Sequence, residues 1–262
     1  MSLNRTFILV ATVLCVVGIV AFFFTRKAEY SQQIDREQPL IEHANALPDP
    51  TPNNHNYKEI LATLAAERQR LAVRYQEASF ADQRSAVIAE SRTLLTQTIY
   101  SDLFPSWYGT RWDFNGTTET PQQGKIACGY FVSTVLRDAG LKVERARLAQ
   151  QASENIILSL TGDTYVRRFR RVEIRDFVDV VKQWGPGIYV VGLDIHVGFI
   201  VNTGSEVYFI HSSYVEPYMV VKEEASESRI LAASNYRVLG KISADDSLIE
   251  KWLLGTEIAT RR

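Results

Sequence analysis

The pattern of the sequence changes at residues 185–187, Gly-Pro-Gly, and this change limits the possible folds more than any other feature. Before it, apolar residues recur at helical spacing, most clearly over 128–139 and 173–184. After it come short segments rich in β-branched and aromatic residues, which predict strands at 188–193, 197–201, 207–210, 218–222 and 236–242. Helices first and hairpin-connected strands afterwards are typical of an α+β domain, with helices packed on an antiparallel sheet.

Two amphipathic stretches over 57–100 precede this domain. In the first, Leu61, Leu64, Leu71 and Tyr75 fall on one helical face, and Asp82 opens the second. Together they predict a helical hairpin in front of a domain over 101–262. We expect the hairpin to pack on that domain, because an apolar helical face usually buries against its own chain. An arm that binds a partner is the alternative.

The N-terminus carries an uncharged, mostly apolar run over residues 6–24. About 20 such residues in a helix span a bilayer, so residues 1–27 are predicted to be an uncleaved, single-pass membrane anchor. Residues 28–56 are polar and rich in proline, which predicts a flexible tether. Basic residues on either side of the run lean slightly towards a cytoplasmic domain. The function expected below favours instead the periplasmic side of the inner membrane.

Composition excludes some classes of function. The formal net charge is -1, so there is no global electrostatic case for binding nucleic acid. The chain has two cysteines, Cys15 and Cys128, and the spacing of cysteine and histidine fits no zinc site. No glycine-rich phosphate loop occurs in the sequence. We therefore expect no metal, no cofactor and no nucleic-acid partner.

Cys128 begins the helix predicted over 128–139. The thiolate is the nucleophilic form of cysteine, so an active cysteine needs a pKa below its usual value of about 8.5. Unpaired N–H groups and the positive end of the dipole at a helix start favour the thiolate, and Lys125 adds a positive charge nearby. Cys128 is thus a candidate nucleophile, although a buried, inert cysteine is the commoner case.

Two histidines, His196 and His211, lie on the two strands of one predicted hairpin. His196 opens the first strand, where it can face a cleft and accept a thiol proton. His211 ends the second strand, so the two rings become neighbours, and His211 can hold the imidazole of His196 in one tautomer. Asp194 and Asn202 are rival candidates for this orienting role.

Three segments resemble the motifs of the NlpC-type papain-like cysteine peptidases: Ala-Cys-Gly-Tyr at 127–130, His-Val-Gly-Phe-Ile at 196–200 and Phe-Ile-His-Ser-Ser at 209–213. The resemblance covers residues 107–213 and implies a papain-like core with a triad of Cys128, His196 and His211. It also implies that Tyr108 lies near the oxyanion site. The chain departs from the family pattern around the cysteine, where Asp-Cys-Ser-Gly is usual.

That family contains bacterial cell-wall endopeptidases and amidases. The resemblance therefore implies a membrane-anchored hydrolase that cleaves amide bonds of peptidoglycan stem peptides. Two alternatives stay open: a thiol amidase, isopeptidase or acyltransferase on a non-wall substrate, and a catalytically inactive domain that binds wall peptide or a protein. Trp112, in an aromatic-rich loop predicted over 104–116, is expected to line a substrate groove or to pack in the core.

Overall fold

The computed structural model of the protein describes residues 57–261. The predicted membrane anchor (1–27) and tether (28–56) lie outside these described residues. Within residues 57–261, no helix combines the length and the apolar character that a bilayer span requires.

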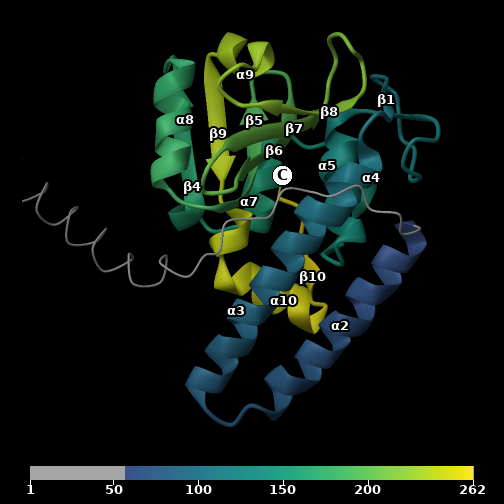
Figure 1. Cartoon of the computed structure of the whole chain (residues 1–262), viewed down its shortest axis with the longest axis vertical. Coiled ribbons are helices and arrows are strands. Elements are labelled where there is room, and N and C mark those ends of the chain that lie inside the picture. Colours follow the sequence, from purple (N-terminus) through teal and green to yellow (C-terminus); the bar gives the residue numbers. More distant parts are fainter. Residues whose placement is uncertain (1–56, 262) are drawn as a thin grey trace, which may run out of the picture. The chain divides into compact units, whose positions relative to one another are not determined.

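A six-stranded antiparallel sheet forms the centre of the described domain (Figure 1). Its strands lie in the order β4-β9-β5-β6-β7-β8. Every residue of β5 and β6 is buried, because both faces of the sheet are covered. The predicted α+β class is thus confirmed. The strands are β4 (Val166–Arg170), β5 (Gly187–Leu193), β6 (Val197–Asn202), β7 (Val207–Ser212), β8 (Val220–Glu224) and β9 (Tyr236–Gly240).

Helices cover the two faces of the sheet. Successive residues of a strand point to opposite faces of the sheet, so they contribute to two separate apolar clusters. Phe199 of β6 joins the cluster that contains α5 (Cys128–Asp138) and α7 (Ser153–Leu160). Phe209 of β7 joins the other cluster, with α8 (Ile174–Gln183). Figure 1 shows α8 and α5 on opposite sides of the strands.

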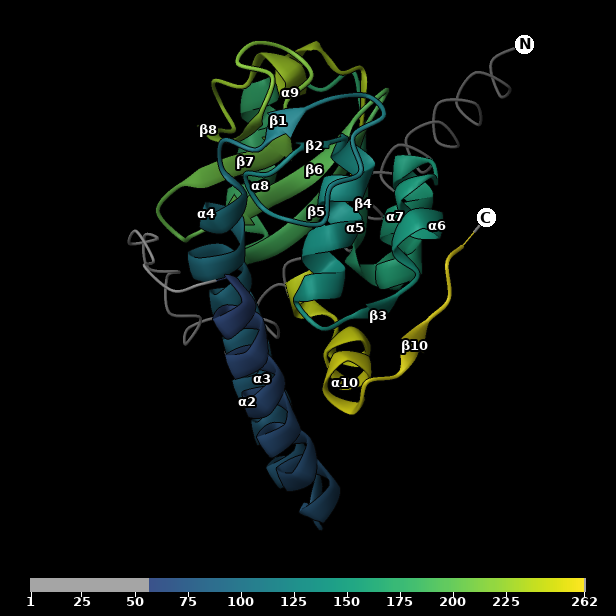
Figure 2. The same ribbon diagram turned by 90° about the vertical axis from the view of Figure 1, so that its right-hand side faces the viewer.

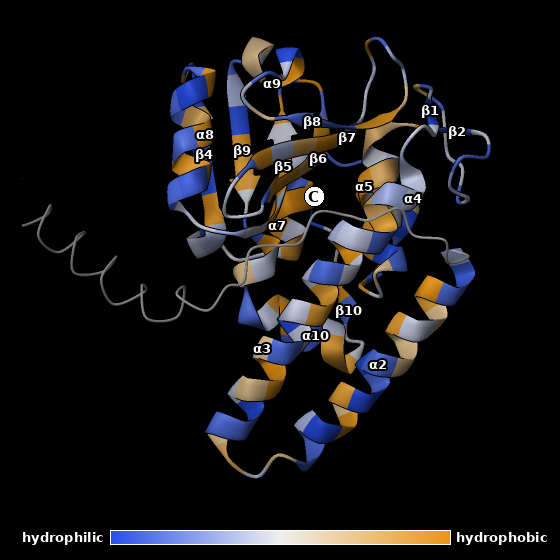
Figure 3. Cartoon of the chain, in the orientation of Figure 1, coloured by the Kyte–Doolittle hydropathy of each residue, from blue (hydrophilic) through white to orange (hydrophobic). Residues whose placement is uncertain are grey.

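The helical hairpin of α2 (Tyr57–Glu77) and α3 (Ala81–Thr98) runs away from the sheet (Figure 2). Hydrophobic and hydrophilic residues alternate around both helices (Figure 3), and the buried hydrophobic ones belong to the same cluster as α5 and α10 (Asp246–Leu254). The hydroxyl of Tyr57 donates a hydrogen bond of 2.7 Å to Oδ2 of Asp138, the last residue of α5. The hairpin is therefore tied to the helix that begins at Cys128.

The segment after α3 is helical, although the sequence predicted an aromatic-rich loop from residue 104. The chain continues as a π-helical turn (Ile99–Leu103) and then as α4 (Phe104–Trp107). Pro105 fits there because proline is tolerated in the first turn of a helix. This path buries Trp107 against Phe131 of α5, with the ring centres 6.2 Å apart. The loop prediction was wrong for its first turn because the helix brings these aromatic rings into the core.

Shorter elements complete the domain. The loop between β1 and β2 leads through β2 to Cys128. These elements are β1 (Arg111–Trp112) paired with β2 (Lys125–Ile126), β3 (Lys142–Val143) paired with β10 (Glu257–Ile258), α6 (Arg145–Ala149), α9 (Arg229–Ala233), and two 3-10 turns at Asp163–Tyr165 and Ile242–Ala244.

Candidate active site

Cys128 is the first residue of α5, as the sequence predicted. Its position depends on close packing between α5 and α6. A Cβ on Gly129 would lie 2.2 Å from the carbonyl oxygen of Ala149, so a residue with a side chain would push the two helices apart. This contact gives a physical reason for the glycine that follows the cysteine, where the NlpC-type pattern has serine.

The thiol of Cys128 is mostly buried. Burial raises its pKa, and hydrogen bonds from the backbone of Val197, Gly129 and Cys128 itself lower it by a smaller amount. Lys125 is salt-bridged to Asp113 at 2.9 Å and does not contribute. The expected depression of the thiol pKa was therefore wrong, because the loss of solvation outweighs the favourable groups at the helix start.

His196 and His211 are in contact, as expected, and both side chains are buried. Nε2 of His196 lies 2.9 Å from Nδ1 of His211, and the two rings are nearly perpendicular at 86°. Gly198 makes room for them, since a Cβ there would lie 2.8 Å from Cβ of His211 and 2.7 Å from the ring of Phe209. The glycine of the His-Val-Gly segment is thus required by the histidine pair itself.

His211 has a further partner that the sequence did not reveal. Its Nε2 lies 3.2 Å from Oε1 of Glu223 on β8. The His211 ring also stacks on the ring of Phe209, with 4.0 Å between ring centres. The strand predicted over 218–222 extends in the structure to Glu224. Alternate residues of a strand share one face, so extending the predicted strand by one residue places Glu223 on the same face as His211.

Burial sets the protonation of the histidine pair. It lowers the pKa of His196 well below the usual value, and the neighbouring His211 lowers it further. Burial also lowers the pKa of His211, although Glu223 opposes this effect. Both rings are therefore neutral at neutral pH.

The fold brings Cys128 to the backbone beside His196, without a hydrogen bond between the thiol and the imidazole. The thiol lies against the backbone N–H of Val197, the residue after His196. Among residues 57–261, no hydrogen bond joins Sγ of Cys128 to His196. Because Nε2 of His196 is occupied by His211, Nδ1 is the ring nitrogen left for the thiol.

The two rivals for the orienting role have structural partners instead. Asp194 accepts hydrogen bonds from the backbone N–H groups of Asn235 and Tyr236, at 2.7 and 3.1 Å. Asn202 donates to the carbonyl oxygen of Val181 at 2.9 Å. Of the three candidates, His211 is the one that contacts His196.

Tyr108 and Trp112 lie in the segment between α4 and β2. The hydroxyl of Tyr108 is buried and has no hydrogen-bond partner among the described residues, and burial raises its pKa. Trp112 packs against Tyr214 and Tyr218, with 6.4 Å between ring centres in each case. Tyr214 in turn lies 5.0 Å from the ring of His196, so Trp112 reaches the candidate site through this tyrosine.

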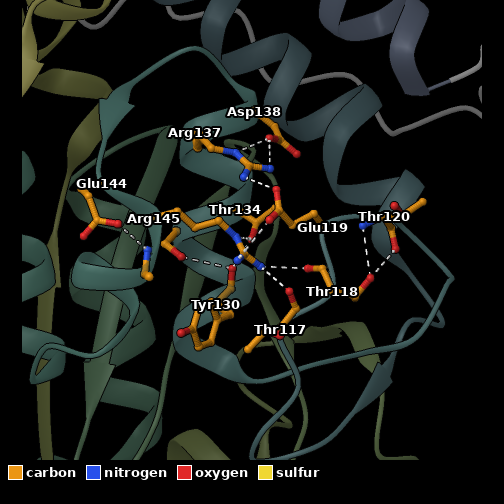
Figure 4. A network of polar contacts seen from close by, with 12 residues as sticks. Thr117, Thr118, Glu119, Thr120, Tyr130, Thr134, Arg137, Asp138, Glu144 and Arg145 are labelled. Atoms are coloured by element: carbon orange, nitrogen blue, oxygen red, sulfur yellow. Dashed lines mark hydrogen bonds and ion pairs between the residues drawn. The ribbon is translucent and has the colours of Figure 1, made fainter.

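A polar network holds the loop before β2 against α5 and α6 (Figure 4). The guanidinium of Arg145 donates to Oγ1 of Thr134 at 2.7 Å and to the carbonyl oxygens of Thr117 and Thr118 at 2.9 Å. It also lies 4.8 Å from the ring centre of Tyr130. Because this loop leads into Cys128, Arg145 helps to fix the position of the candidate nucleophile. Nothing in the local sequence distinguishes Arg145 from the other arginines.

Comparison of the chain with protein-family models, with curated proteins and with solved structures found no significant match.

Proposed function

We propose that the protein is a cysteine hydrolase that cleaves amide bonds, with Cys128 as nucleophile, His196 as general base and His211 as the group that orients the base. The observation that carries this proposal is the buried contact of 2.9 Å between Nε2 of His196 and Nδ1 of His211, next to a cysteine at a helix start. A nucleophile, a base and an orienting group are the parts that thiol catalysis needs.

The reaction is an acyl transfer in two stages. His196 takes the thiol proton at Nδ1, and Sγ attacks the carbonyl carbon of the substrate amide. We assign the oxyanion to the hydroxyl of Tyr108, which has no partner among residues 57–261, and to the N–H of Cys128, which bonds to its own thiol in the free protein. His196 then gives its proton to the leaving amine, which leaves a thioester. Water that loses a proton to the same imidazole hydrolyses this thioester and releases the acid.

The free protein rests with a neutral thiol and a neutral imidazole rather than as an ion pair. This follows because burial raises the pKa of Cys128 and lowers that of His196. Proton transfer therefore accompanies substrate binding, when the thiol approaches Nδ1 and the developing charges stabilise each other.

The finer fold and the substrate follow from the resemblance described above. A cysteine helix on an antiparallel sheet, with one histidine at the start of β6 and the other on the adjoining β7, fits a papain-like core. We favour peptidoglycan stem peptides as the substrate and, given the predicted anchor, the periplasmic side of the inner membrane as the place of action. An amidase, isopeptidase or acyltransferase with another acyl substrate would use the same residues.

One observation favours a second candidate function. A buried thiol with a raised pKa, and without a hydrogen bond to His196 in residues 57–261, is also what a catalytically inactive binding domain would contain. Such a domain would hold wall peptide or a partner protein beside Trp112 and Tyr218.

The test is incubation of the full-length protein with purified peptidoglycan and muropeptides, with products read by mass spectrometry. Cys128→Ala is the inactive control, and Cys15→Ser is the matched control for the other thiol. New stem-peptide fragments that are absent with Cys128→Ala would establish a wall hydrolase and identify the bond. No cleavage by a protein whose Cys128 reacts rapidly with iodoacetamide would indicate another acyl substrate. No cleavage, together with a thiol whose alkylation rate is the same in His196→Ala, would favour the binding domain.

A further inference from the structure

Glu223 ends a chain of side-chain contacts that starts at His196. Oε1 of Glu223 lies 3.2 Å from Nε2 of His211, and Nδ1 of His211 lies 2.9 Å from Nε2 of His196. His211 and Glu223 lie on the paired strands β7 and β8, and His196 directly precedes β6, which pairs with β7. The histidines are buried, and only the carboxylate end of this chain meets solvent.

The direction of each hydrogen bond follows from the chemistry of the carboxylate. An ionised carboxylate accepts hydrogen bonds and donates none, so Nε2 of a neutral His211 carries the proton that faces Glu223. Nδ1 of His211 is then an acceptor, and Nε2 of His196 must carry the proton that faces it. Nδ1 of His196 is left with its lone pair. One carboxylate thus decides the tautomers of two rings.

We propose that Glu223 is a positioning residue: by fixing both histidines as Nε2–H tautomers, it makes Nδ1 of His196 the atom that takes the proton of Cys128. This inference rests on the proposed function, because it concerns the same base. In the reverse order, His196 would present an N–H to the thiol instead of a lone pair. The negative charge of Glu223 also stabilises the imidazolium that forms after proton transfer.

The groups around Glu223 keep it ionised. Burial raises its pKa, but hydrogen bonds with His211 and Ser228 and the positive charge of Arg229 lower it by more. Among residues 57–261, the aromatic rings that pack on the two imidazoles are those of Phe209 and Tyr214. Within residues 57–261, Glu223 supplies the only carboxylate that is bonded to either ring.

The tautomers can be read directly by long-range 1H–15N correlation NMR on the full-length protein. The chain has four histidines, so His43→Asn and His55→Asn leave only the two rings of interest. In this background both rings should show the Nε2–H pattern. Glu223→Gln should add the Nδ1–H form at both rings, because an amide can donate as well as accept. Nδ1–H rings with Glu223 present, or pure Nε2–H rings in Glu223→Gln, would overturn the inference.

The consequence for the thiol is tested by the rate of iodoacetamide alkylation against pH, in a Cys15→Ser background. At about pH 7, Glu223→Gln should slow the reaction of Cys128 by about tenfold, since one pKa unit changes the thiolate fraction by that factor. At about pH 10 the difference should vanish, because hydroxide then takes the thiol proton. The exposed neighbour Glu224 provides the matched control, Glu224→Gln, which should behave as the parent protein.

His196→Ala separates failure of this inference from failure of the proposed function. A slow thiol in His196→Ala, together with a parent-like rate in Glu223→Gln, would overturn the role of Glu223 and leave the proposed function intact. A parent-like rate in both variants would show that the thiol is not coupled to the imidazole, and both proposals would then fall.

Discussion

Oγ of Ser212 donates a hydrogen bond of 2.8 Å to the carbonyl oxygen of Ile126, and this contact joins the histidine strand to the segment that carries Cys128. Ser212 follows His211 at the end of β7, and Ile126 ends β2 just before α5 begins. Both residues are fully buried. Two parts of the candidate site that are far apart in sequence are thus held together by a hydrogen bond that water does not reach.

Ser212→Ala is expected to weaken this link. The substitution leaves the buried carbonyl of Ile126 without its donor, which should lower the free energy of unfolding by about 1–3 kcal/mol. It should also slow the alkylation of Cys128 at neutral pH, because the thiol moves relative to His196. Urea unfolding and iodoacetamide kinetics measure the two effects. Ser205→Ala, in the exposed β6–β7 turn, is the control; a Ser212→Ala protein as stable as this control would argue against the link.

Arg145→Ala is expected to release the loop over 113–124. The guanidinium makes hydrogen bonds with two loop carbonyls and with Thr134, and one hydrogen bond to a charged group contributes about 1.5–3 kcal/mol. Limited proteolysis should therefore cut this loop faster in the variant, and Cys128 should lose reactivity. Arg147→Ala changes an exposed arginine of the same helix and should do neither. Equal cutting rates in the two variants would contradict the role given to Arg145.

Tyr108→Phe should separate stability from activity. The hydroxyl is buried without a partner in residues 57–261, so its removal costs no protein hydrogen bond and should leave the free energy of unfolding unchanged or slightly higher. If the hydroxyl serves the oxyanion as proposed, kcat should fall by about 100-fold. Turnover and urea unfolding are measured beside Tyr75→Phe, which removes an exposed hydroxyl bonded to Glu250. Full activity in Tyr108→Phe would remove Tyr108 from the mechanism.

The histidine pair should make the fold sensitive to acid. Burial, and for His196 also the neighbouring ring, lowers the pKa of both histidines in the folded state. Below about pH 6.5 the unfolded chain therefore binds protons that the folded protein does not, and the free energy of unfolding should decrease as the pH falls. Glu223, whose folded pKa is also lowered, stabilises the fold above its unfolded pKa of about 4.3 and loses this contribution at lower pH.

Urea unfolding at several pH values between about 8 and 5 tests this acid sensitivity. His211→Gln removes one of the two buried titrations, so it should be less stable than the parent protein at high pH but lose less stability on acidification. His55→Gln, outside the described residues, should keep the parent slope. If the free energy of unfolding falls with pH at the same rate in His211→Gln and in the parent protein, the buried ring is not responsible for the acid sensitivity.

The strands and the histidine pair were open to prediction because they depend on local pattern. β5 and β6 are covered on both faces, so they read as continuous apolar runs bounded by turn residues. His196 directly precedes β6 and His211 lies on β7, and the short connection between these two strands fixes which residues become neighbours. The edge strand β4 gave no such signal, because arginines separate its buried residues Val166 and Phe169.

The properties that escaped prediction depend on contacts between distant segments. The pairing of β7 with β8 brings Glu223 to the site. The sequence pattern of β8 alone does not show how far that strand extends. The direction of the pKa shift at Cys128 depends on how deeply the fold buries the thiol, which the favourable helix start does not reveal. Local sequence therefore predicts which groups meet more readily than it predicts their protonation.

Gly198 offers a way to search for relatives of this protein. Glycine at position 129 is required by the packing of α5 on α6, which concerns the helices and not the histidine pair. Glycine at position 198 is required by the pair itself, because any side chain there would displace His211 from His196. A search profile should therefore give most weight to the positions of His196, Gly198 and His211. We expect it to detect divergent homologues that a profile centred on the cysteine would miss.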